Sequence, residues 1–375
     1  MDRHTVDIYE RNAPQYAARR GAEQPDRAKA FAASLPRRGM RLDLGCGPGH
    51  YLPHLGRPAV AADAAVGMLL EARRRNPTTP LVAGDLEALP IRPASLDGVW
   101  ASKCVQHIPA TRVPMALHEL HRALRVGAIL DMTVFEGRGE APGPDRIAVD
   151  RDEFPGRLFT SWTPQQLDDV LVGAGFTIDE IRVLDATENR PIRRVVVRAT
   201  RARSLADTVA PRMRVLVCGL NPSHYAADAG VGFARPGNRF WAAALAAGLV
   251  TVDRDPMRAL HGDHVGMTDL VKRATVAASE LNPHEFRSGL RRVESLVRWL
   301  EPGVVCFVGL AGWRSAVDRR AVPGVQAVTF GETAVYLMPS TSGLNARTSL
   351  GQLADHLGAA AGLADLPPRG AALGS

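Results

Sequence analysis

Lysine is almost absent from this sequence of 375 residues, and cysteine is too sparse to build a metal site or a disulfide framework. Only three lysines occur, so arginine supplies nearly all of the basic charge, and the sequence pI of about 9.7 reflects a coding bias more than a function. The four cysteines lie far apart, without a Cys-x-x-Cys pair or a Cys/His cluster. We therefore expect reduced, buried thiols and no metal site.

Long hydrophobic segments are also missing. No uninterrupted apolar run of about 18 residues occurs, and the charged N-terminal segment lacks the apolar core of a secretory signal. We therefore expect a monomer in the bacterial cytoplasm with no membrane association. The net charge is +7, and both halves of the chain are mildly basic without a concentrated basic stripe. Such a charge is compatible with a nucleic-acid partner but does not require one.

Short apolar runs alternate with helical patterns in both halves, which is typical of two tandem α/β domains. In the first half the runs predict a Rossmann-like seven-stranded sheet with strands at 41–45, 59–63, 80–84, 96–101, 128–135, 177–184 and 193–200. In the second half they predict a parallel sheet with flanking helices, with strands at 213–219, 304–309, 325–330 and 334–339. We place the first domain at 1–205, a linker at 206–212, the second domain at 213–362 and a disordered tail at 363–375.

A glycine-rich loop follows the first expected strand. Asp43, Gly45, Gly47 and Gly49 form the pattern D-x-G-x-G-x-G, where the chain must turn sharply and let a ligand approach its backbone. Such a loop is either a tight turn without a ligand or the cofactor loop of an open parallel sheet. Asp63, at the end of the second strand, favours the cofactor loop, because a carboxylate there can accept both hydroxyls of a ribose. The spacing differs from the G-x-G-x-x-G of dinucleotide sites, which points to a cofactor without phosphate.

With these motifs, residues 5–200 resemble the class I methyltransferases, which use S-adenosyl-L-methionine. The resemblance implies that Asp43 and the glycine loop approach the amino-acid part of this cofactor and that Asp63 holds its ribose. It further implies that Asp85 and Leu86 reach the adenine and that Ser102 lines the pocket.

Three ring residues near this expected pocket have open roles. Tyr9 and Tyr16 lie in a segment that resembles the lid helix of the family, where they either close over the methyl group or simply pack the helix. His107 is either a base or a packing residue. The sequence around it contains neither the N/D-P-P-Y tetrapeptide nor the Pro-Cys nucleophile of DNA-base methyltransferases, so acceptors of those types are not expected. The segment from Gly137 to Thr163 contains no recognisable selector, and the methyl acceptor stays unassigned.

The second half carries four motifs in order, all expected at loop positions beyond strand ends. The strand at 213–219 runs into G-L-N-P-S, which contains Asn221. The later motifs are G-V-G-F-A-R-P-G-N-R-F-W, which contains Phe233, then Gly266 to Asp269, and then M-P-S-T-S-G-L-N-A-R after the last strand. This constellation is similar to the mismatch-specific uracil/thymine DNA glycosylases, over Met213 to Leu357.

The resemblance implies roles for these residues. Asn221 positions the attacking water through its carboxamide, because an amide cannot act as a base at neutral pH. Phe233 either stacks on the extruded pyrimidine or packs in the core. Ser223 replaces the usual second glycine of the motif, which narrows the space beside the water and disfavours thymine. Tyr225 is a further candidate for the pocket.

The last motif is either a wedge that holds the gap left by the extruded nucleotide or a Ser/Gly-rich surface loop. As a wedge, Leu344 fills the vacated space, while Asn345 and the glycine backbone bond the orphaned partner base. The candidate wedge residues are Ser340, Ser342, Gly343, Leu344 and Asn345.

These inferences predict a cofactor-independent, monofunctional glycosylase fused to an S-adenosyl-L-methionine-dependent methyltransferase. The glycosylase is expected to remove uracil, or thymine and related damaged bases, from mismatches with guanine in double-stranded DNA. No lysine stands at a site position, so an intact abasic strand is the expected product. In the alternative, the methyltransferase acts on a small molecule or a nucleic acid, and the second domain binds nucleic acid without cleaving it.

Overall fold

The computed structural model of the chain describes residues 1–137, 152–187 and 192–365. They form two compact units. The first comprises Met1–Val172 and Phe176–Ala202, and the second comprises Gly173–Gly175 and the chain from Arg203 onward. Residues 366–375 of the expected tail lie outside the described residues, whereas 363 and 364 belong to the last helix.

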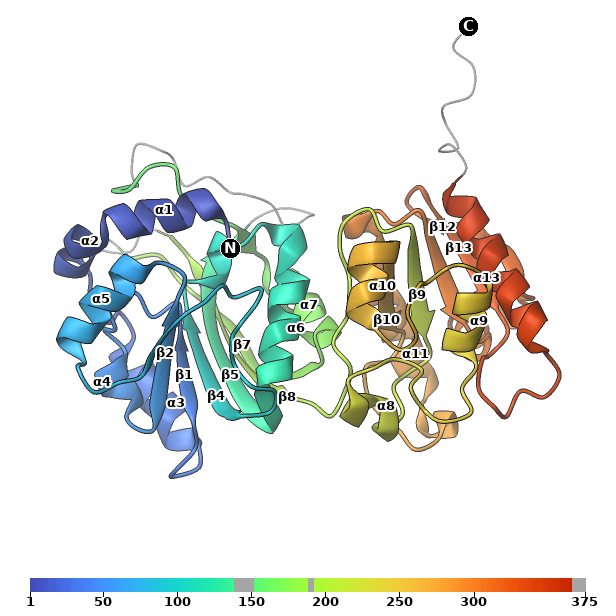
Figure 1. The fold of residues 1–375 in the computed structure, drawn as a ribbon, viewed down its shortest axis with the longest axis horizontal. Helices are drawn as coiled ribbons and strands as arrows, with labels where there is room; N and C mark the ends of the chain where they lie inside the picture. The colour runs from blue at the N-terminus through green and yellow to red at the C-terminus, as the bar shows by residue number, and fades with distance from the viewer. Residues whose placement is uncertain (138–151, 188–191, 366–375) are drawn as a thin grey trace, which may run out of the picture. The chain divides into compact units, whose positions relative to one another are not determined.

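The first unit is built on a sheet with the strand order β3-β2-β1-β4-β5-β8-β7 (Figure 1). The first five of these strands are parallel, and β8 runs antiparallel to both β5 and β7. All seven expected strands are present, so the Rossmann-like class is confirmed, and a further short strand, β6, pairs with β5. The strands are β1 (Arg41–Leu44), β2 (Ala59–Asp63), β3 (Leu81–Ala83), β4 (Leu96–Ser102), β5 (Leu124–Glu136), β6 (Ser161–Trp162), β7 (Phe176–Leu184) and β8 (Arg194–Arg201).

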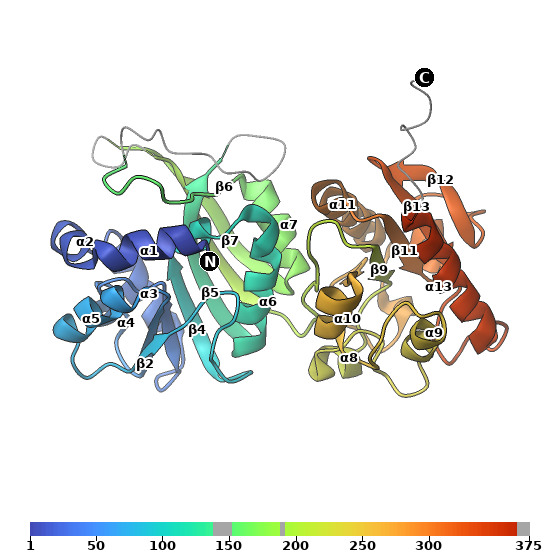
Figure 2. The same cartoon turned by 45° about the horizontal axis from the view of Figure 1, so that its top comes forward.

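Helices flank this sheet, as Figures 1 and 2 show. Asp2 begins the first helix, because its carboxylate accepts a hydrogen bond from the N–H of Thr5 at 2.8 Å. Thr163 and Gln166 exchange side-chain bonds to each other's backbone at the start of α7, where the sequence predicts a Thr cap. The helices are α1 (Arg3–Arg11), α2 (Ala13–Arg19), α3 (Pro25–Ser34), α4 (Leu52–Leu55), α5 (Val66–Arg75), α6 (Val113–Ala123) and α7 (Pro164–Gly173), with 3-10 turns η1 (Val105–His107) and η2 (Ala110–Arg112).

The second unit contains a sheet of order β10-β9-β11-β13-β12. Two sequence expectations are wrong here. The segment Gly266 to Asp269 is not a loop but most of β10, which pairs in parallel with β9. Strand β12 runs antiparallel to β13, because only Gly331 and Glu332 connect them and so short a turn makes a hairpin. The strands are β9 (Val215–Gly219), β10 (Val265–Asp269), β11 (Val304–Val308), β12 (Gly324–Phe330) and β13 (Thr333–Met338).

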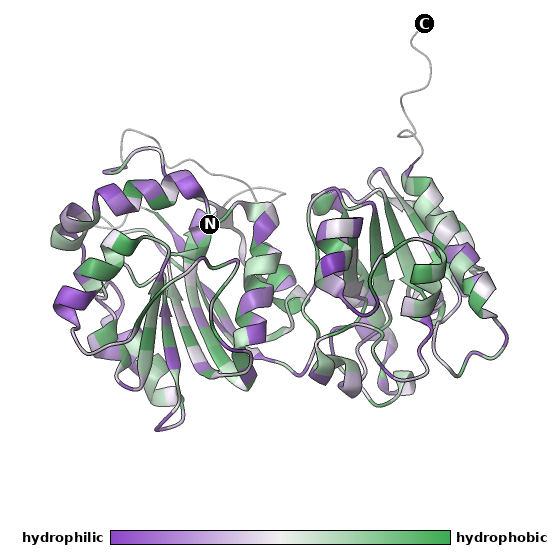
Figure 3. Ribbon diagram, viewed as in Figure 1, coloured by the Kyte–Doolittle hydropathy of each residue, from purple (hydrophilic) through white to green (hydrophobic). Residues whose placement is uncertain are grey.

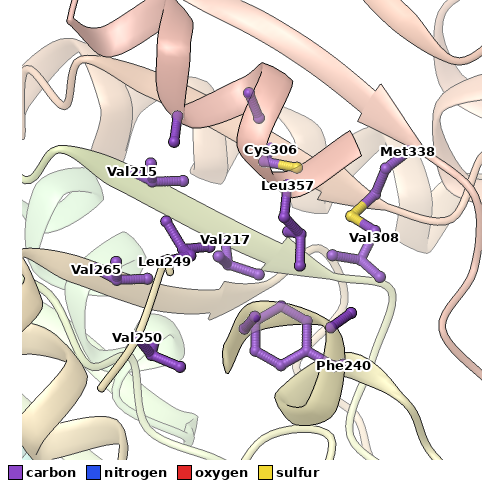
Figure 4. Close-up of a cluster of buried hydrophobic side chains, with 14 of the residues drawn as sticks. Val215, Val217, Phe240, Leu249, Val250, Val265, Cys306, Val308, Met338 and Leu357 are labelled. Atoms are coloured by element: carbon purple, nitrogen blue, oxygen red, sulfur yellow. The ribbon is translucent and has the colours of Figure 1, made fainter. Parts of the chain in front are cut away.

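Hydrophobic strands and amphipathic helices form the core of the second unit, as the colouring in Figure 3 shows. Valines of β9 and β11 meet α9 and α13 in a buried cluster that includes Phe240, Met338 and Leu357 (Figure 4). The helices are α8 (His224–Ala229), α9 (Phe240–Ala246), α10 (Pro256–Asp263), α11 (Pro283–Leu300), α12 (Ala311–Ala316) and α13 (Leu350–Ala364), with the 3-10 turn η4 (Ala278–Glu280).

The four cysteines are buried and unpaired, as the sequence predicts. No helix within residues 1–137, 152–187 and 192–365 has both the length and the apolar character needed to cross a membrane. In the same residues, no three His, Cys, Asp or Glu side chains are grouped so that they could hold a metal ion.

Candidate active sites

A cavity of the first unit opens at the carboxyl ends of β1, β2 and β4, where open parallel sheets bind their ligands. The empty space within it is about 790 Å³, a value that includes space open to solvent. The expected residues Asp43, Gly45, Gly47, Asp63 and Ser102 all line it. Tyr9, Tyr16 and His107 line it as well, so α1 and α2 contribute to its wall.

The glycine loop has the geometry that its sequence predicts. Gly45, Gly47 and Gly49 adopt φ values of +60°, +51° and +75°, in the left-handed region that favours glycine. A Cβ on Gly45 would lie 2.3 Å from the Cβ of Cys104, whereas a Cβ on Gly47 would meet nothing closer than Tyr16 Cε1 at 4.0 Å. Gly45 is therefore required by packing, and Gly47 leaves open space on the cavity side.

Asp63 anchors this loop. Its Oδ2 accepts a hydrogen bond from the N–H of Gly47 at 2.8 Å, and its Oδ1 accepts one from the N–H of Ala65 at 2.9 Å. Burial raises the pKa of Asp63 to about 6 in spite of these bonds, which lower it. Each carboxylate oxygen keeps a further lone pair, so the group can still accept hydrogen bonds from a ligand.

Asp43 lies in β1 with an almost completely buried side chain, and its Oδ2 has no hydrogen-bond partner among the described residues. Burial and the nearby carboxylate of Asp63 hold the pKa of Asp43 well above its usual range. An ammonium group would supply the missing partner and favour the ionised carboxylate. The unpartnered carboxylate oxygen of Asp43 is therefore chemically suited to an ammonium group, such as the one in the amino-acid part of S-adenosyl-L-methionine.

The two residues expected at the adenine lie outside the set that lines this cavity. Asp85 accepts hydrogen bonds at 2.6 Å from the amino group of Met1, and Leu86 is buried. Ser102 does line the cavity, with its hydroxyl 3.4 Å from that of Tyr51.

His107 is held by two hydrogen bonds. Its Nδ1 lies 2.7 Å from the carbonyl oxygen of Leu158, and its Nε2 lies 2.9 Å from the hydroxyl of Tyr9. A carbonyl only accepts, so the proton is on Nδ1 and Nε2 accepts from the tyrosine. Burial lowers the pKa of His107 to about 4, which keeps the ring neutral at pH 7. Of the two roles left open by the sequence, this geometry favours packing and hydrogen bonding over proton abstraction.

Arg157 contacts Tyr9 in the wall of this cavity, and sequence analysis did not identify it. Its Nη1 donates to the hydroxyl of Tyr9 at 2.8 Å, and its guanidinium lies over the rings of Tyr9, Phe154 and Phe159 at 5.0 to 5.4 Å. Asp152 forms an ion pair with it. Asp152, Phe154 and Phe159 lie within five residues of Arg157, but Tyr9 comes near it only in the folded chain, so no local pattern signals the contact with the cavity wall.

In the second unit, Asn221 follows β9 with its carboxamide held in one orientation. Its Nδ2 donates to the carbonyl oxygens of Arg273 at 3.0 Å and Pro222 at 3.2 Å, and to Oγ1 of Thr275 at 2.8 Å. Carbonyl oxygens only accept, so the nitrogen must face them. The Oδ1 atom accepts no hydrogen bond within the described part of the chain and is available to a water molecule.

Ser223 and Tyr225, both expected beside this asparagine, belong to the start of α8. The Oγ of Ser223 accepts a hydrogen bond from the N–H of Ala226 at 3.1 Å and caps the helix. The hydroxyl is thereby turned toward the helix. The Tyr225 side chain is 53% exposed, and neither residue lines the cavity beside Phe233.

That cavity encloses about 340 Å³, including open solvent, at the carboxyl end of β10. Phe233 lines it with a φ of +58°, and its ring is stacked on Phe240 with centroids 4.2 Å apart. A Cβ on Gly219 would lie 3.3 Å from Cζ of Phe233 and 2.4 Å from Oδ1 of Asp269. The edge of the Phe233 ring and the carboxylate of Asp269 therefore both lie close to Gly219 at the end of β9. Asn221, two residues further along the chain, does not line this cavity.

Asp269 is a second residue that sequence analysis missed, because it was taken as part of a loop motif. Its carboxylate lines the cavity and forms no hydrogen bond with the described residues. Burial raises the pKa of Asp269 to about 6, although Lys272 and Arg292 lower it. A perturbed acid at the end of a strand and inside a cavity is typical of a functional site.

The expected wedge loop is a compact turn with one exposed apolar tip. Leu344 is 94% exposed, the largest exposed fraction of any large hydrophobic side chain in the described residues. The Nδ2 of Asn345 donates to the carbonyl oxygen of Ser340 at 2.8 Å and to Oγ1 of Thr348 at 3.1 Å. The Asn345 amide nitrogen is therefore used inside the loop, and the expected bond from this side chain to an orphaned base stays a prediction. A Cβ on Gly343 would lie 2.9 Å from the carbonyl oxygen of Gly237.

The fold and the two sites define a protein of two α/β domains, each with a cavity at the carboxyl ends of its strands. Comparison with known proteins assigns the families. Residues 42–131 match the family model of a methyltransferase domain, and residues 206–358 match that of the uracil DNA glycosylase superfamily. The chain thus joins a methyltransferase domain to a domain of the uracil DNA glycosylase superfamily.

Several solved methyltransferase structures are similar to about half of the chain. One is an S-adenosylmethionine-dependent methyltransferase of Methanosarcina mazei, 17% identical, which covers 46% of this chain and 97% of its own with a TM-score of 0.41. Another is the 1,6-didemethyltoxoflavin-N1-methyltransferase of Burkholderia thailandensis with bound S-adenosylhomocysteine, 20% identical, which covers 52% of this chain and 88% of its own with a TM-score of 0.42.

Proposed function

We propose that the second domain is a monofunctional DNA glycosylase that removes uracil from mismatches with guanine. The orientation of Asn221 is the observation that carries this proposal. Three acceptors hold its amide nitrogen, and its Oδ1 is left without a partner at the carboxyl end of β9. Such an oxygen can hold a water molecule but cannot remove a full proton from it, so the C–N bond must break largely before the water adds.

The neighbouring elements fit the other steps of such a reaction. The nucleotide must leave the stack, at a cost of a few kcal/mol that is smallest for mismatched pairs. The exposed side chain of Leu344 would fill the gap, and the ring of Phe233 would stack on the base. The bonding electrons leave with the base, the sugar carbon gains hydroxide from the water, and the released proton goes to the base or to solvent.

Backbone donors are also available for the departing base. The N–H groups of Asn221 and Phe233 form no hydrogen bond within the described residues. Backbone N–H groups that are fixed before the reaction stabilise developing negative charge without reorganisation. Uracil, a more acidic leaving group than most bases, is expected to react best.

A cleavage assay tests this proposal. A duplex oligonucleotide with one G·U pair is incubated with the protein and then with hot alkali. We expect alkali-labile sites with the native protein, none with Asn221→Ala, and persistent activity with Asn282→Ala, which removes an exposed amide that caps α11 instead. Binding of the duplex without abasic sites would favour a nucleic-acid-binding module that does not cleave. Thymine, ethenocytosine and hypoxanthine substrates then define the specificity.

We further propose that the first domain uses S-adenosyl-L-methionine, with Asp43 at the ammonium, the loop around Gly47 at the amino-acid part and Asp63 at the ribose. The bound group would supply an electrophilic methyl on a sulfonium, and the domain would mainly hold the acceptor in line with it. A calorimetric titration checks this assignment, because Asp63→Ala should abolish cofactor binding and the exposed control Asp26→Ala should not. The same lack of binding in the native protein would contradict it.

A further inference from the structure

The residues Arg239 and Phe240 stand where α9 begins, and they contact two different loops of the proposed glycosylase site. Phe240 is completely buried, and its ring is stacked on the ring of Phe233 with a centroid distance of 4.2 Å. The next residue, Trp241, donates from its indole nitrogen to the carbonyl oxygen of Gly232 at 2.8 Å. The start of α9 thus holds the Phe233 loop by a stacked ring and by a hydrogen bond next to it.

On the other side, Arg239 holds the wedge loop. Its Nη2 donates to the carbonyl oxygen of Asn345 at 2.5 Å, and its Nη1 donates to that of Thr348 at 2.6 Å. Its backbone N–H donates to the carbonyl oxygen of Thr341 at 2.9 Å. The guanidinium of Arg239 bonds the two ends of the segment 345–348, just after the exposed tip of the loop. No carboxylate within the described residues forms an ion pair with it, so the loop carbonyls are its hydrogen-bond acceptors.

The loops also meet at the backbone. Gly343 lies so close to Gly237 that a Cβ on it would come within 2.9 Å of the carbonyl oxygen of Gly237. Asn238 closes the connection, because its Oδ1 accepts a hydrogen bond from the N–H of Phe240 at 2.9 Å. The short segment 237–241 is therefore in contact with both the base-stacking loop and the wedge loop.

We infer that Arg239 is a positioning residue that couples the wedge loop to the base-stacking wall. When Leu344 enters the stack, the forked bonds of Arg239 keep the loop in register with Phe240, and Phe240 keeps Phe233 in place for the extruded base. A lysine cannot replace this fork, because it offers one charged nitrogen where two separate carbonyls must be held. The inference rests on the proposed glycosylase function.

The test compares duplex and single-stranded substrates. A uracil in single-stranded DNA needs no extrusion from a duplex, so its excision does not depend on the wedge. For Arg239→Lys and Arg239→Ala we expect kcat/KM on a G·U duplex to fall roughly tenfold or more, as for the loss of one or two charge-assisted hydrogen bonds. Excision from single strands should change less than about twofold. Arg298→Ala removes the same charge from an exposed ion pair on α11 and is the control.

A second readout does not depend on cleavage. In the inactive Asn221→Ala background, a 2-aminopurine placed beside the uracil reports extrusion by its fluorescence, and Arg239→Lys should reduce that signal as Leu344→Ala does. Equal losses on duplex and single-stranded DNA, or an unchanged fluorescence signal, would overturn the inference. If Arg239→Ala fails to fold, Arg239→Lys decides. Absence of any cleavage by the native protein would instead refute the proposed function.

Discussion

The carboxylate of Asp63 bridges the end of β2 and the glycine loop by accepting the N–H of Gly47 at 2.8 Å. This bond places a group whose pKa burial raises to about 6 directly beside the proposed cofactor. The conformation of the glycine loop therefore depends on a hydrogen bond to Asp63, a carboxyl group with a pKa near 6.

Cofactor affinity should therefore depend on pH. A ribose hydroxyl donates best to an ionised carboxylate, and below pH 6 the carboxyl of Asp63 must first lose its proton. We expect the dissociation constant for S-adenosyl-L-methionine to rise by up to about tenfold per pH unit as the pH falls from 6 to 5. Isothermal titration from pH 5 to 8 measures it. Asp63→Asn should bind more weakly with a shallower pH dependence, and a constant dissociation constant in the native protein would contradict the assignment.

Two alanine substitutions separate backbone strain from steric clash in the first domain. Gly45 and Gly127 both have positive φ, but a Cβ at Gly127 would have no heavy atom within 4 Å. Gly127→Ala should cost about 1 kcal/mol, and Gly45→Ala, whose Cβ collides with Cys104, should cost several kcal/mol. Calorimetric unfolding of the full chain measures both. Equal losses would show that the loop shifts to admit the methyl group.

Asp269 predicts a pH-dependent stability in the second domain. Its folded pKa of about 6 lies above its ordinary value of 3.8, so the folded state binds the proton more tightly. The native protein accordingly loses stability as the pH rises from about 4 to about 6 and does not regain it above that range. Asp269→Asn escapes this loss and should be more stable than the native protein by about 1–3 kcal/mol at pH 8, and by much less at pH 4.

Denaturant unfolding at these two pH values measures the difference. The exposed Asp318→Asn is a matched control on the same domain and should show no such change. If the difference in unfolding free energy between the native protein and Asp269→Asn is the same at both pH values, the pKa of Asp269 is not raised in the folded protein.

Leu344→Ala should separate stability from function. A side chain that is 94% exposed contributes little to folding, so the free energy of unfolding should stay within about 0.5 kcal/mol of the native value. Excision from a G·U duplex should fall roughly tenfold or more, because the gap left by the base is no longer filled. Val276→Ala, 72% exposed outside the wedge loop, is the control and should leave excision unchanged. Full duplex activity of Leu344→Ala would contradict the wedge.

Much of the fold could be predicted because the strands of the first sheet are short apolar runs between helical patterns. Strand β10 was not predicted, because Gly266 interrupts its run of apolar residues. That glycine is explained only by the fold, since a Cβ there would lie 2.0 Å from Sδ of Met213 and 3.1 Å from the carbonyl oxygen of Thr208. Strand β12 was found, but its direction depends on a two-residue turn whose hairpin geometry was not recognised.

The candidate sites divide in a similar way. The glycine loop and Asn221 are defined by local patterns, so the sequence located them. Asp269 and Arg157 have no such pattern, because the raised pKa of Asp269 comes from burial and the position of Arg157 depends on Tyr9, which is distant in the sequence. The positive φ of Phe233 is equally hidden, since nothing in the neighbouring residues requires a phenylalanine to adopt it.

The wedge loop orders itself when the chain folds. Arg239 and Asn345 hold its backbone in the absence of DNA, while Leu344 stays in water at the tip. The conformational entropy lost in shaping this loop therefore belongs to the folding equilibrium and does not weaken association with DNA. If the loop enters DNA as proposed, the contact would mainly remove one leucine side chain from water, and we would expect a small negative heat-capacity change of binding from it.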